Sequence, residues 1–370
     1  MKPIKNILFI KLCCIGDILF LTPAIRSVRE RYPEAKITLL ASTWIKDIVE
    51  RIPSVNEIVY YDTPYKNISV IRKLFETMTV ITMLRSKQFD AVIIGHRSSF
   101  FSFLALVSGI RRRIGFDNFI FLTDKVQFYS SLHETARYVQ LSERLTGENT
   151  VKSMELAATS ADTLFAEHYL EKFNIRKNAT LIGIFPGGGD NPGTKMHIKR
   201  WNSERYAELI KKLYTEESLI PVFLGSASDT TVISDISMLI SGTVPFVNAA
   251  GAFGLGELTG VLKKLAVVIG GDSGPIHMAA ALGVPTISIF GPSDPRLVAP
   301  QGELHRYLWK HVECSPCYTP KTVKNKKYFK GNEFICITGT HACINELSVQ
   351  EVYQNVEELL QLIPERRGHT

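Results

Sequence analysis

The chain has 370 residues, of which 45% are hydrophobic and 21% charged, and its formal net charge is +7 at pH 7. This length exceeds what one hydrophobic core usually organises, so we expect a globular protein of two domains, and the composition excludes extended disorder. The moderate positive charge suits an anionic ligand or an anionic lipid surface, whereas no interleaved basic and aromatic residues indicate nucleic-acid binding.

The N-terminal segment is predicted to form a buried strand over residues 6–11. Lys11 and Asp17 interrupt its apolar run and no small-residue cleavage site follows, which excludes a signal peptide. The longest apolar stretch elsewhere, residues 100–110, is shorter than the roughly 20 residues that cross a bilayer. We therefore expect a cytoplasmic protein that contacts a membrane only at its surface.

Short strand-forming runs alternate with amphipathic helical patterns along the chain. Strands are predicted at 6–11, 36–41, 57–61, 89–94, 180–185, 220–224, 266–270 and 286–290. The alternation predicts an α/β fold with parallel sheets covered on both faces. Because the pattern restarts at Thr180 after a polar stretch, we expect two Rossmann-like doubly wound domains, 1–175 and 176–347, facing a central cleft. A helix within 348–370 would pack back across the domains.

Asp17 follows the first predicted strand. Thr22 and Pro23 are residue types favoured at the N-cap and first position of a helix, so we expect them to open the next helix. Asp17 would then lie in a strand-to-helix turn at the edge of the sheet. Such an aspartate either caps a helix or acts as a general base on an acceptor hydroxyl.

A basic run, Arg111, Arg112 and Arg113, follows the apolar segment 100–104. These residues suit an anionic acceptor or a membrane surface. A buried helix followed by an exposed arginine turn explains the same residues without a ligand.

Gly187 and Gly188 follow the predicted strand 180–185, and Lys199 comes shortly after them. Glycines let a backbone approach a ligand closely, and a lysine can neutralise a diphosphate. A flexible turn and a solvated charge are the alternative, but the position at the same sheet edge as the next motif favours binding.

The strand at 266–270 runs into Asp272, Ser273 and Gly274, which open a helix. Backbone N–H groups and a helix N-terminus at one place suit a phosphate or diphosphate, and Asp272 can accept hydrogen bonds from ligand hydroxyls. His277 fits either a ligand contact or the packing of strand against helix.

Four cysteines, Cys314, Cys317, Cys336 and Cys343, follow in the last third of the chain. A C-x2-C pair with two later cysteines is compatible with a structural zinc or iron ion. The six residues between Cys336 and Cys343 depart from the usual zinc-site spacing. A redox pair and four unligated thiols remain open.

Several motifs occur together in a characteristic order. They are Gly16-Asp17-Ile18-Leu19, Pro186-Gly187-Gly188, Lys199-Arg200-Trp201, the run from Asp272 to Pro285, and Phe290-Gly291-Pro292-Ser293. In this the chain resembles glycosyltransferase family 9, the ADP-heptose:lipopolysaccharide heptosyltransferases.

The resemblance implies a GT-B fold with the acceptor on the N-terminal domain and the nucleotide sugar on the C-terminal one. It implies inverting, metal-independent transfer of heptose from ADP-heptose to the lipopolysaccharide inner core, at the cytoplasmic face of the inner membrane. Asp17 would be the general base and Lys199 would hold the diphosphate. Asp272, Ser273 and Gly274 would bind the sugar and phosphates.

The family's nucleoside-contacting glutamate has no direct match, and Asp229 is the nearest candidate. Three alternatives stay open beside lipopolysaccharide heptosylation. They are a family 9 transferase with another nucleotide sugar or with a protein or capsule acceptor, a nucleotide-sugar epimerase, and a non-catalytic nucleotide-sugar-binding protein. The sequence indicates no oligomeric state.

Overall fold

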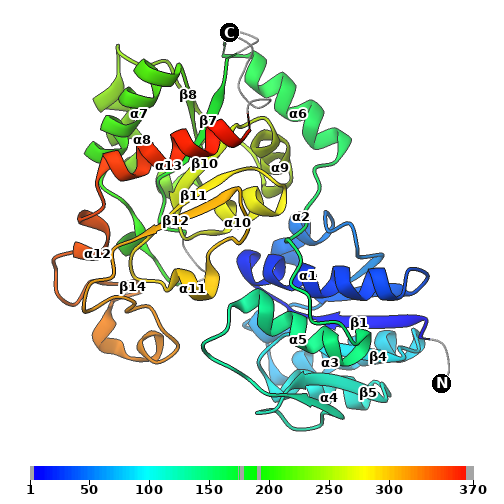
Figure 1. Cartoon of the computed structure of the whole chain (residues 1–370). Helices are drawn as coiled ribbons and strands as arrows, with labels where there is room; N and C mark the ends of the chain where they lie inside the picture. Colours follow the sequence, from blue (N-terminus) through cyan, green and yellow to red (C-terminus); the bar gives the residue numbers. More distant parts are fainter. Residues whose placement is uncertain (1–3, 174, 176–178, 190–192, 364–370) are drawn as a thin grey trace. The chain divides into compact units, whose positions relative to one another are not determined.

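The computed structural model describes residues 4–173, 175, 179–189 and 193–363. The chain folds as two compact units, Met1–Ala157 and Ala158–Thr370 (Figure 1). Each unit contains a six-stranded sheet in which all the paired strands are parallel. The predicted α/β class with two doubly wound sheets is therefore confirmed.

The first sheet has the strand order β3-β2-β1-β4-β5-β6 of a Rossmann fold. Its strands are β1 (Asn6–Ile10), β2 (Lys36–Ala41), β3 (Glu57–Tyr60), β4 (Ala91–Ile94), β5 (Arg112–Phe116) and β6 (Asp124–Val126). The helices of this unit are α1 (Ile15–Arg31), α2 (Lys46–Val49), α3 (Val70–Ser86), α4 (Ser99–Val107) and α5 (Glu134–Thr146).

The second sheet has the order β12-β11-β10-β7-β8-β9, which is the same topology. Its strands are β7 (Leu181–Phe185), β8 (Ile220–Phe223), β9 (Val247–Asn248), β10 (Val267–Gly271), β11 (Thr286–Phe290) and β12 (His305–Trp309). Its helices are α6 (Ser160–Glu171), α7 (Ser203–Glu217), α8 (Thr230–Ile240), α9 (Leu255–Lys263), α10 (Gly274–Ala281), α11 (Pro295–Val298), α12 (Ala342–Asn345) and α13 (Val349–Leu362). A separate antiparallel pair joins β13 (Phe329–Lys330) to β14 (Glu333–Phe334).

Helix α1 begins earlier than the sequence pattern predicts. It starts at Ile15, so Pro23 lies inside the helix and does not open it. A proline at this position cannot donate to the carbonyl of Leu19. The hydroxyl of Thr22 donates to that carbonyl instead, at 2.7 Å, which allows the helix to continue.

Helix α6 belongs to the second unit, whereas the predicted boundary at 175/176 placed it in the first. Its first turn packs on α9, where the hydroxyl of Thr259 donates to the carboxylate of Asp162 at 3.3 Å. A Cβ at Gly260 would lie 2.0 Å from the backbone oxygen of Asp162, so only glycine allows this close approach. Helix α13 also packs within the second unit, against α7, β10 and β11.

We expect Gly260→Ala to destabilise the protein by at least about 1 kcal/mol, because overpacking against a backbone atom outweighs the helix propensity that alanine gains. Denaturant unfolding followed by circular dichroism measures the change. Lys263→Ala, at an exposed position of the same helix, is the matched control. Unchanged stability of Gly260→Ala would contradict the tight α6–α9 contact.

Candidate functional site

The strand order reverses once in each sheet, between β1 and β4 in the first unit and between β7 and β10 in the second. The connections that follow these two neighbouring strands run to opposite faces of the sheet. A crevice therefore opens between them at the carboxyl ends of the strands. Ligands of doubly wound folds bind there. The side chains that follow these four strands are therefore the candidate site residues.

In the first unit, Asp17 lies in the first turn of α1 and is held by three donors. Lys11, directly after β1, donates to Oδ1 at 3.0 Å, and the Tyr138 hydroxyl of α5 donates to the same oxygen at 3.3 Å. The backbone N–H of Cys14 donates to Oδ2 at 3.4 Å. Asp17 therefore caps α1 and forms an ion pair as well, while 37% of its side chain stays exposed.

Opposing effects set the pKa of Asp17. Burial raises it, but the charge of Lys11 and hydrogen bonds from Lys11 and Cys14 outweigh burial and hold the pKa below its ordinary value. Burial in turn lowers the pKa of Lys11, yet the charge of Asp17 raises it well above the usual range. The pair is therefore ionised throughout the neutral pH range.

His96 and Arg97 follow β4 at the same edge. The backbone N–H of Leu12 donates to Nδ1 of His96 at 3.5 Å. Burial, and after it the charge of Lys11, lowers the pKa of His96 to about 4, which keeps the ring neutral at pH 7. Arg97 pairs with Glu134 at 2.6 Å.

Sequence reasoning missed the roles of Lys11, His96, Arg97 and Tyr138. His96 and Arg97 directly follow the predicted strand 89–94, and a position at the carboxyl end of a strand could have marked them as site residues. Tyr138 lies on α5, 121 residues from Asp17 along the chain, and only the packing of α1 against α5 brings it there.

In the second unit, the loop after β7 packs against the loop after β10. Gly187 and Gly188 lie in the first loop, and Gly189 ends its described part. Gly189 has φ +67°, and a Cβ there would lie 2.6 Å from the Cβ of Ser273. The structure thus brings the predicted glycine segment and the predicted helix start together.

Lys199 and Asp272 form a buried ion pair in this unit. Nζ of Lys199 donates to Oδ2 of Asp272 at 2.7 Å and to its backbone carbonyl at 3.1 Å. Nε2 of His277 lies 3.4 Å from Oδ1. Burial raises the pKa of Asp272, but the charge of Lys199 and the contact with His277 outweigh it, and the pKa falls far below its usual range.

Ser273 is the N-cap of α10 and Gly274 is its first residue. The first N–H groups of a helix have no acceptor within it. An ammonium group has three donors, and Lys199 directs two at Asp272. The arrangement can thus offer a lysine proton and a helix N-terminus to an anion.

The β13–β14 pair supports the segment before Lys199. The N–H of Lys195 donates to the carbonyl of Asn332 at 2.9 Å, and the N–H of Phe334 donates to Lys195 at 3.1 Å. Phe334 packs on Met196 and Ile198 in a small separate core. The ring of Tyr318 lies 5.2 Å from Nζ of Lys199.

Asp229 follows β8 and interacts within the protein. Oδ2 accepts hydrogen bonds from the backbone and hydroxyl of Ser226 at 3.0 and 2.9 Å, and Oδ1 pairs with Arg200 at 3.1 Å. These contacts give Asp229 a structural role, and its predicted nucleoside contact gains no support from them.

The predicted exposed arginine turn is wrong for two of its residues, because Arg112 and Arg113 belong to β5. Arg112 pairs with Asp124 of β6 at 3.1 Å. Arg113 donates to the carbonyls of Phe121 and Ile110, each at 2.6 Å. These contacts hold β5 to its neighbours, so Arg111 is exposed whereas Arg112 and Arg113 are partly exposed.

The four cysteines Cys314, Cys317, Cys336 and Cys343 are free thiols. Burial, followed by the neighbouring thiols, raises the pKa of Cys317 to about 11 and that of Cys343 to about 12. Within the described residues, no group of three or more His, Cys, Asp or Glu side chains is arranged to hold a metal ion. The predicted zinc or iron site thus has no geometric support.

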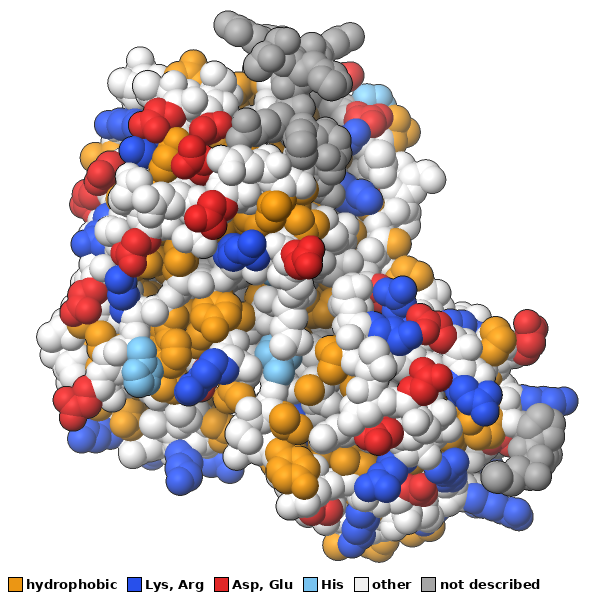
Figure 2. All heavy atoms as spheres, in the orientation of Figure 1, with side chains coloured by type: hydrophobic (Ala, Val, Ile, Leu, Met, Phe, Trp, Pro, Cys, Tyr) orange, Lys and Arg blue, Asp and Glu red, His pale blue; other side chains and the backbone are white. Residues whose placement is uncertain are grey.

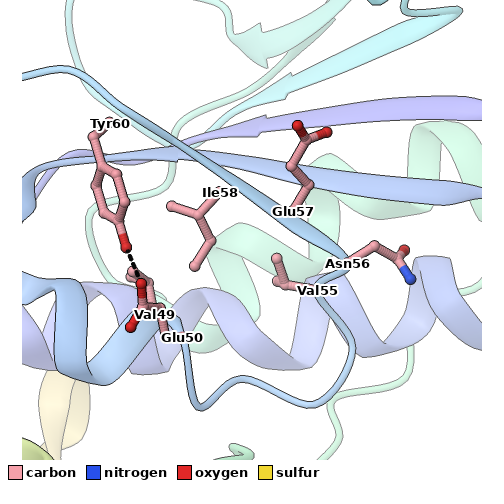
Figure 3. Close-up of a pocket in the computed structure, with 7 residues that line it drawn as sticks. All are labelled: Val49, Glu50, Val55, Asn56, Glu57, Ile58 and Tyr60. Atoms are coloured by element: carbon pink, nitrogen blue, oxygen red, sulfur yellow. Dashed lines mark hydrogen bonds between the residues drawn. The ribbon is translucent and has the colours of Figure 1, made fainter.

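A pocket of about 280 Å³ lies beside the edge strand β3 (Figure 3). Its polar groups are already paired: Tyr60 donates to Glu50 at 2.8 Å, and Glu57 pairs with Lys36 at 2.9 Å. None of the predicted site residues lines it. In Figure 2, basic and acidic side chains are interspersed over the visible face, so no single charged patch marks a site there.

We expect Lys199→Met to destabilise the protein by about 3–5 kcal/mol at neutral pH, because the buried carboxylate of Asp272 loses its partner. This deficit, the difference in unfolding free energy between the variant and wild type, should shrink as the pH falls toward and below 3.8, the ordinary pKa of aspartate. A protonated Asp272 no longer needs a lysine partner. Urea unfolding across this pH range measures it. Lys264→Met, which removes an exposed ion pair with Glu167, should change little. A deficit that does not depend on pH would contradict the ion-pair explanation.

Comparison with known proteins agrees with this arrangement. The family model "Glycosyltransferase family 9 (heptosyltransferase)" matches residues 77–328. The lipopolysaccharide core heptosyltransferase OpsX of Haemophilus influenzae is 24% identical over 319 residues, which is 84% of this chain and 85% of that protein.

Two solved structures share the fold. The glycosyl transferase family 9 protein of Veillonella parvula has a TM-score of 0.77 at 21% identity, covering 97% of both chains. The Escherichia coli ADP-heptose lps heptosyltransferase II has a TM-score of 0.74 at 21% identity, covering 97% of this chain and 99% of that one. The predicted GT-B-type fold is confirmed. The chain belongs to glycosyltransferase family 9, the heptosyltransferases, and is a glycosyltransferase.

Proposed function

We propose that this glycosyltransferase moves heptose from ADP-heptose to the inner core of lipopolysaccharide at the cytoplasmic face of the inner membrane. The observation that carries the proposal is Asp17, a carboxylate kept ionised by Lys11 yet 37% exposed at the strand reversal of the first sheet. The names of the relatives support the choice of sugar and acceptor, since they act on the lipopolysaccharide core or are described with ADP-heptose.

In the proposed reaction, Asp17 accepts the proton of an acceptor hydroxyl as that oxygen attacks the anomeric carbon of the heptose. The bond from this carbon to the diphosphate breaks with inversion, and ADP leaves with the electron pair. A carboxylate that stays ionised at neutral pH is ready for this proton. No catalytic metal takes part in the proposed reaction.

The second unit offers the groups that suit the leaving diphosphate. Lys199 directs two of its three donors at Asp272, and Ser273 and Gly274 open the helix whose N-terminus favours negative charge. Stabilisation of charge as it develops on the diphosphate would lower the barrier directly.

Heptose transfer from ADP-heptose to truncated inner-core acceptors, followed by mass spectrometry, tests the proposal. Wild-type protein should add the mass of one heptose, and Asp17→Asn should be slower by about 100- to 10,000-fold while it still binds ADP-heptose. Asp47→Asn, on α2 of the same unit, is the matched control and should retain activity. Absence of transfer by folded, donor-binding protein would overturn the proposed substrates.

The pH dependence of transfer tests the role of Lys11. Wild-type kcat/KM should hold down to the lowest pH at which the protein stays folded, because the pKa of Asp17 lies below its ordinary value of 3.8. In Lys11→Met, the lysine charge no longer opposes the effect of burial, so the pKa of Asp17 should rise. The fall of kcat/KM on the acid side of the pH profile, its acid limb, should then occur at higher pH. Lys11→Arg should restore the wild-type limb. A limb that stays in place in Lys11→Met would contradict this role.

A further inference from the structure

Helix α3 carries an apolar stripe that faces solvent. Val80 and Leu84 anchor the helix to the core of the first unit. Five other apolar side chains are 58–81% exposed: Val70, Ile71, Leu74, Phe75 and Met78. A surface helix normally turns its apolar stripe toward the core. An exposed stripe of this size is typical of an interaction surface.

The spacing places these five residues on one face of α3, since residues four apart on a helix lie above one another. The neighbouring threonines add little polarity. The hydroxyl of Thr79 donates to the carbonyl of Phe75 and that of Thr82 to the carbonyl of Met78, each at 3.0 Å. These hydroxyls are satisfied within the helix, so this side of α3 offers water few hydrogen-bonding groups.

The apolar surface continues onto α4, which contacts α3 (Figure 1). The hydroxyl of Tyr61 lies 2.8 Å from that of Thr77 on α3, and the Tyr61 ring stacks on Phe100 of α4 at 6.3 Å between ring centroids. One helical turn further, Phe103 lies 5.4 Å from the ring of Phe121. Phe100, Phe103 and Phe121 are 39%, 45% and 42% exposed. We call these residues, with the α3 stripe, the α3–α4 apolar surface.

Basic residues dominate the segments that carry this surface. Residues 63–87 and 97–126 together contain ten Lys and Arg but only three Asp and Glu. Three of the ten, Lys87, Arg97 and Arg112, pair with Glu57, Glu134 and Asp124, and the others carry the excess of positive charge. The Arg72 side chain, one position from Ile71, is 69% exposed and lies 3.4 Å from the carboxylate of Glu76. Among the residues that the structure describes, no helix is long and apolar enough to cross a membrane. Attachment through this surface would therefore be peripheral.

We propose that the α3–α4 apolar surface docks on an anionic lipid bilayer. The apolar side chains would enter the boundary between headgroups and acyl chains, and the surrounding Lys and Arg would meet negative headgroups. A second copy of the chain is the less suitable occupant, because a two-fold interface would bring the same positive charges together. The proposal goes beyond the proposed function, since it names the surface and its partner and needs no particular sugar.

Flotation of the full chain with vesicles tests the proposal. The probes are vesicles of phosphatidylcholine alone and vesicles that also contain phosphatidylglycerol, both without acceptor, so the outcome does not depend on heptose transfer. The test variant is Ile71→Ser/Phe75→Ser, and Leu74→Ser/Met78→Ser is a second variant on the same stripe. Met238→Ser/Leu239→Ser, at 67% and 42% exposed positions of α8, is the matched control. Circular dichroism verifies that each variant is folded.

Wild-type and control proteins should bind the phosphatidylglycerol vesicles more strongly than pure phosphatidylcholine. Both α3 variants should bind them at least about tenfold more weakly, since each apolar side chain that no longer enters the bilayer costs more than the energy of a tenfold change. Transfer to a soluble, lipid-free acceptor should be unchanged in the α3 variants. Equal binding by all variants, or no binding by wild type, would overturn the proposal. So would a wild-type dimer that Ile71→Ser/Phe75→Ser converts to monomer without loss of vesicle binding.

Discussion

A buried lysine paired with an aspartate at the carboxyl end of an inner strand is the interaction on which both candidate sites depend. In the first unit Lys11 and Asp17 form it beside β1, and in the second Lys199 and Asp272 form it beside β10. A buried charge without its partner is costly, so each pair constrains the chain segments that supply it. The start of α1 and the loop before α10 are fixed in this way. Each of the two sheets, which share one topology, thus carries a lysine-aspartate pair, although different chain segments supply it in each unit.

Most of the inner framework could be predicted from the sequence because inner parallel strands are apolar on both faces. Residues 7–10 and 267–269 are continuous buried runs, and such runs stand out without any knowledge of the fold. The strands that escaped prediction carry little of this signal. In the two six-stranded sheets, β5 opens with two arginines, β6 has three residues and β9 has two, and β12 is an edge strand with partly exposed residues. Their pairing depends on neighbours that are distant along the chain.

The candidate site residues also differ in whether the local sequence reveals them. Asp17, Lys199 and Asp272 belong to local motifs, and the structure places each beside a strand reversal. Tyr138 contacts Asp17 only through the packing of α1 on α5, which no local pattern reveals. Asp229 and Arg112 show the opposite case, since both attracted a ligand-binding interpretation from their type and position. Their charges are met by Arg200 and Asp124 within the protein.

The β13–β14 pair sets an order of events on the ribosome. The segment that carries Lys199 rests on Phe334 and Asn332, which are translated long after it. At the usual rates of synthesis, roughly 7 to 27 s separate the two segments, whereas the first unit is already complete before either emerges. The first unit can therefore fold while the segment before Lys199 still lacks Asn332 and Phe334, against which it packs. The segment before Lys199 thus gains its packing partner only after residues 332–334 have been synthesised.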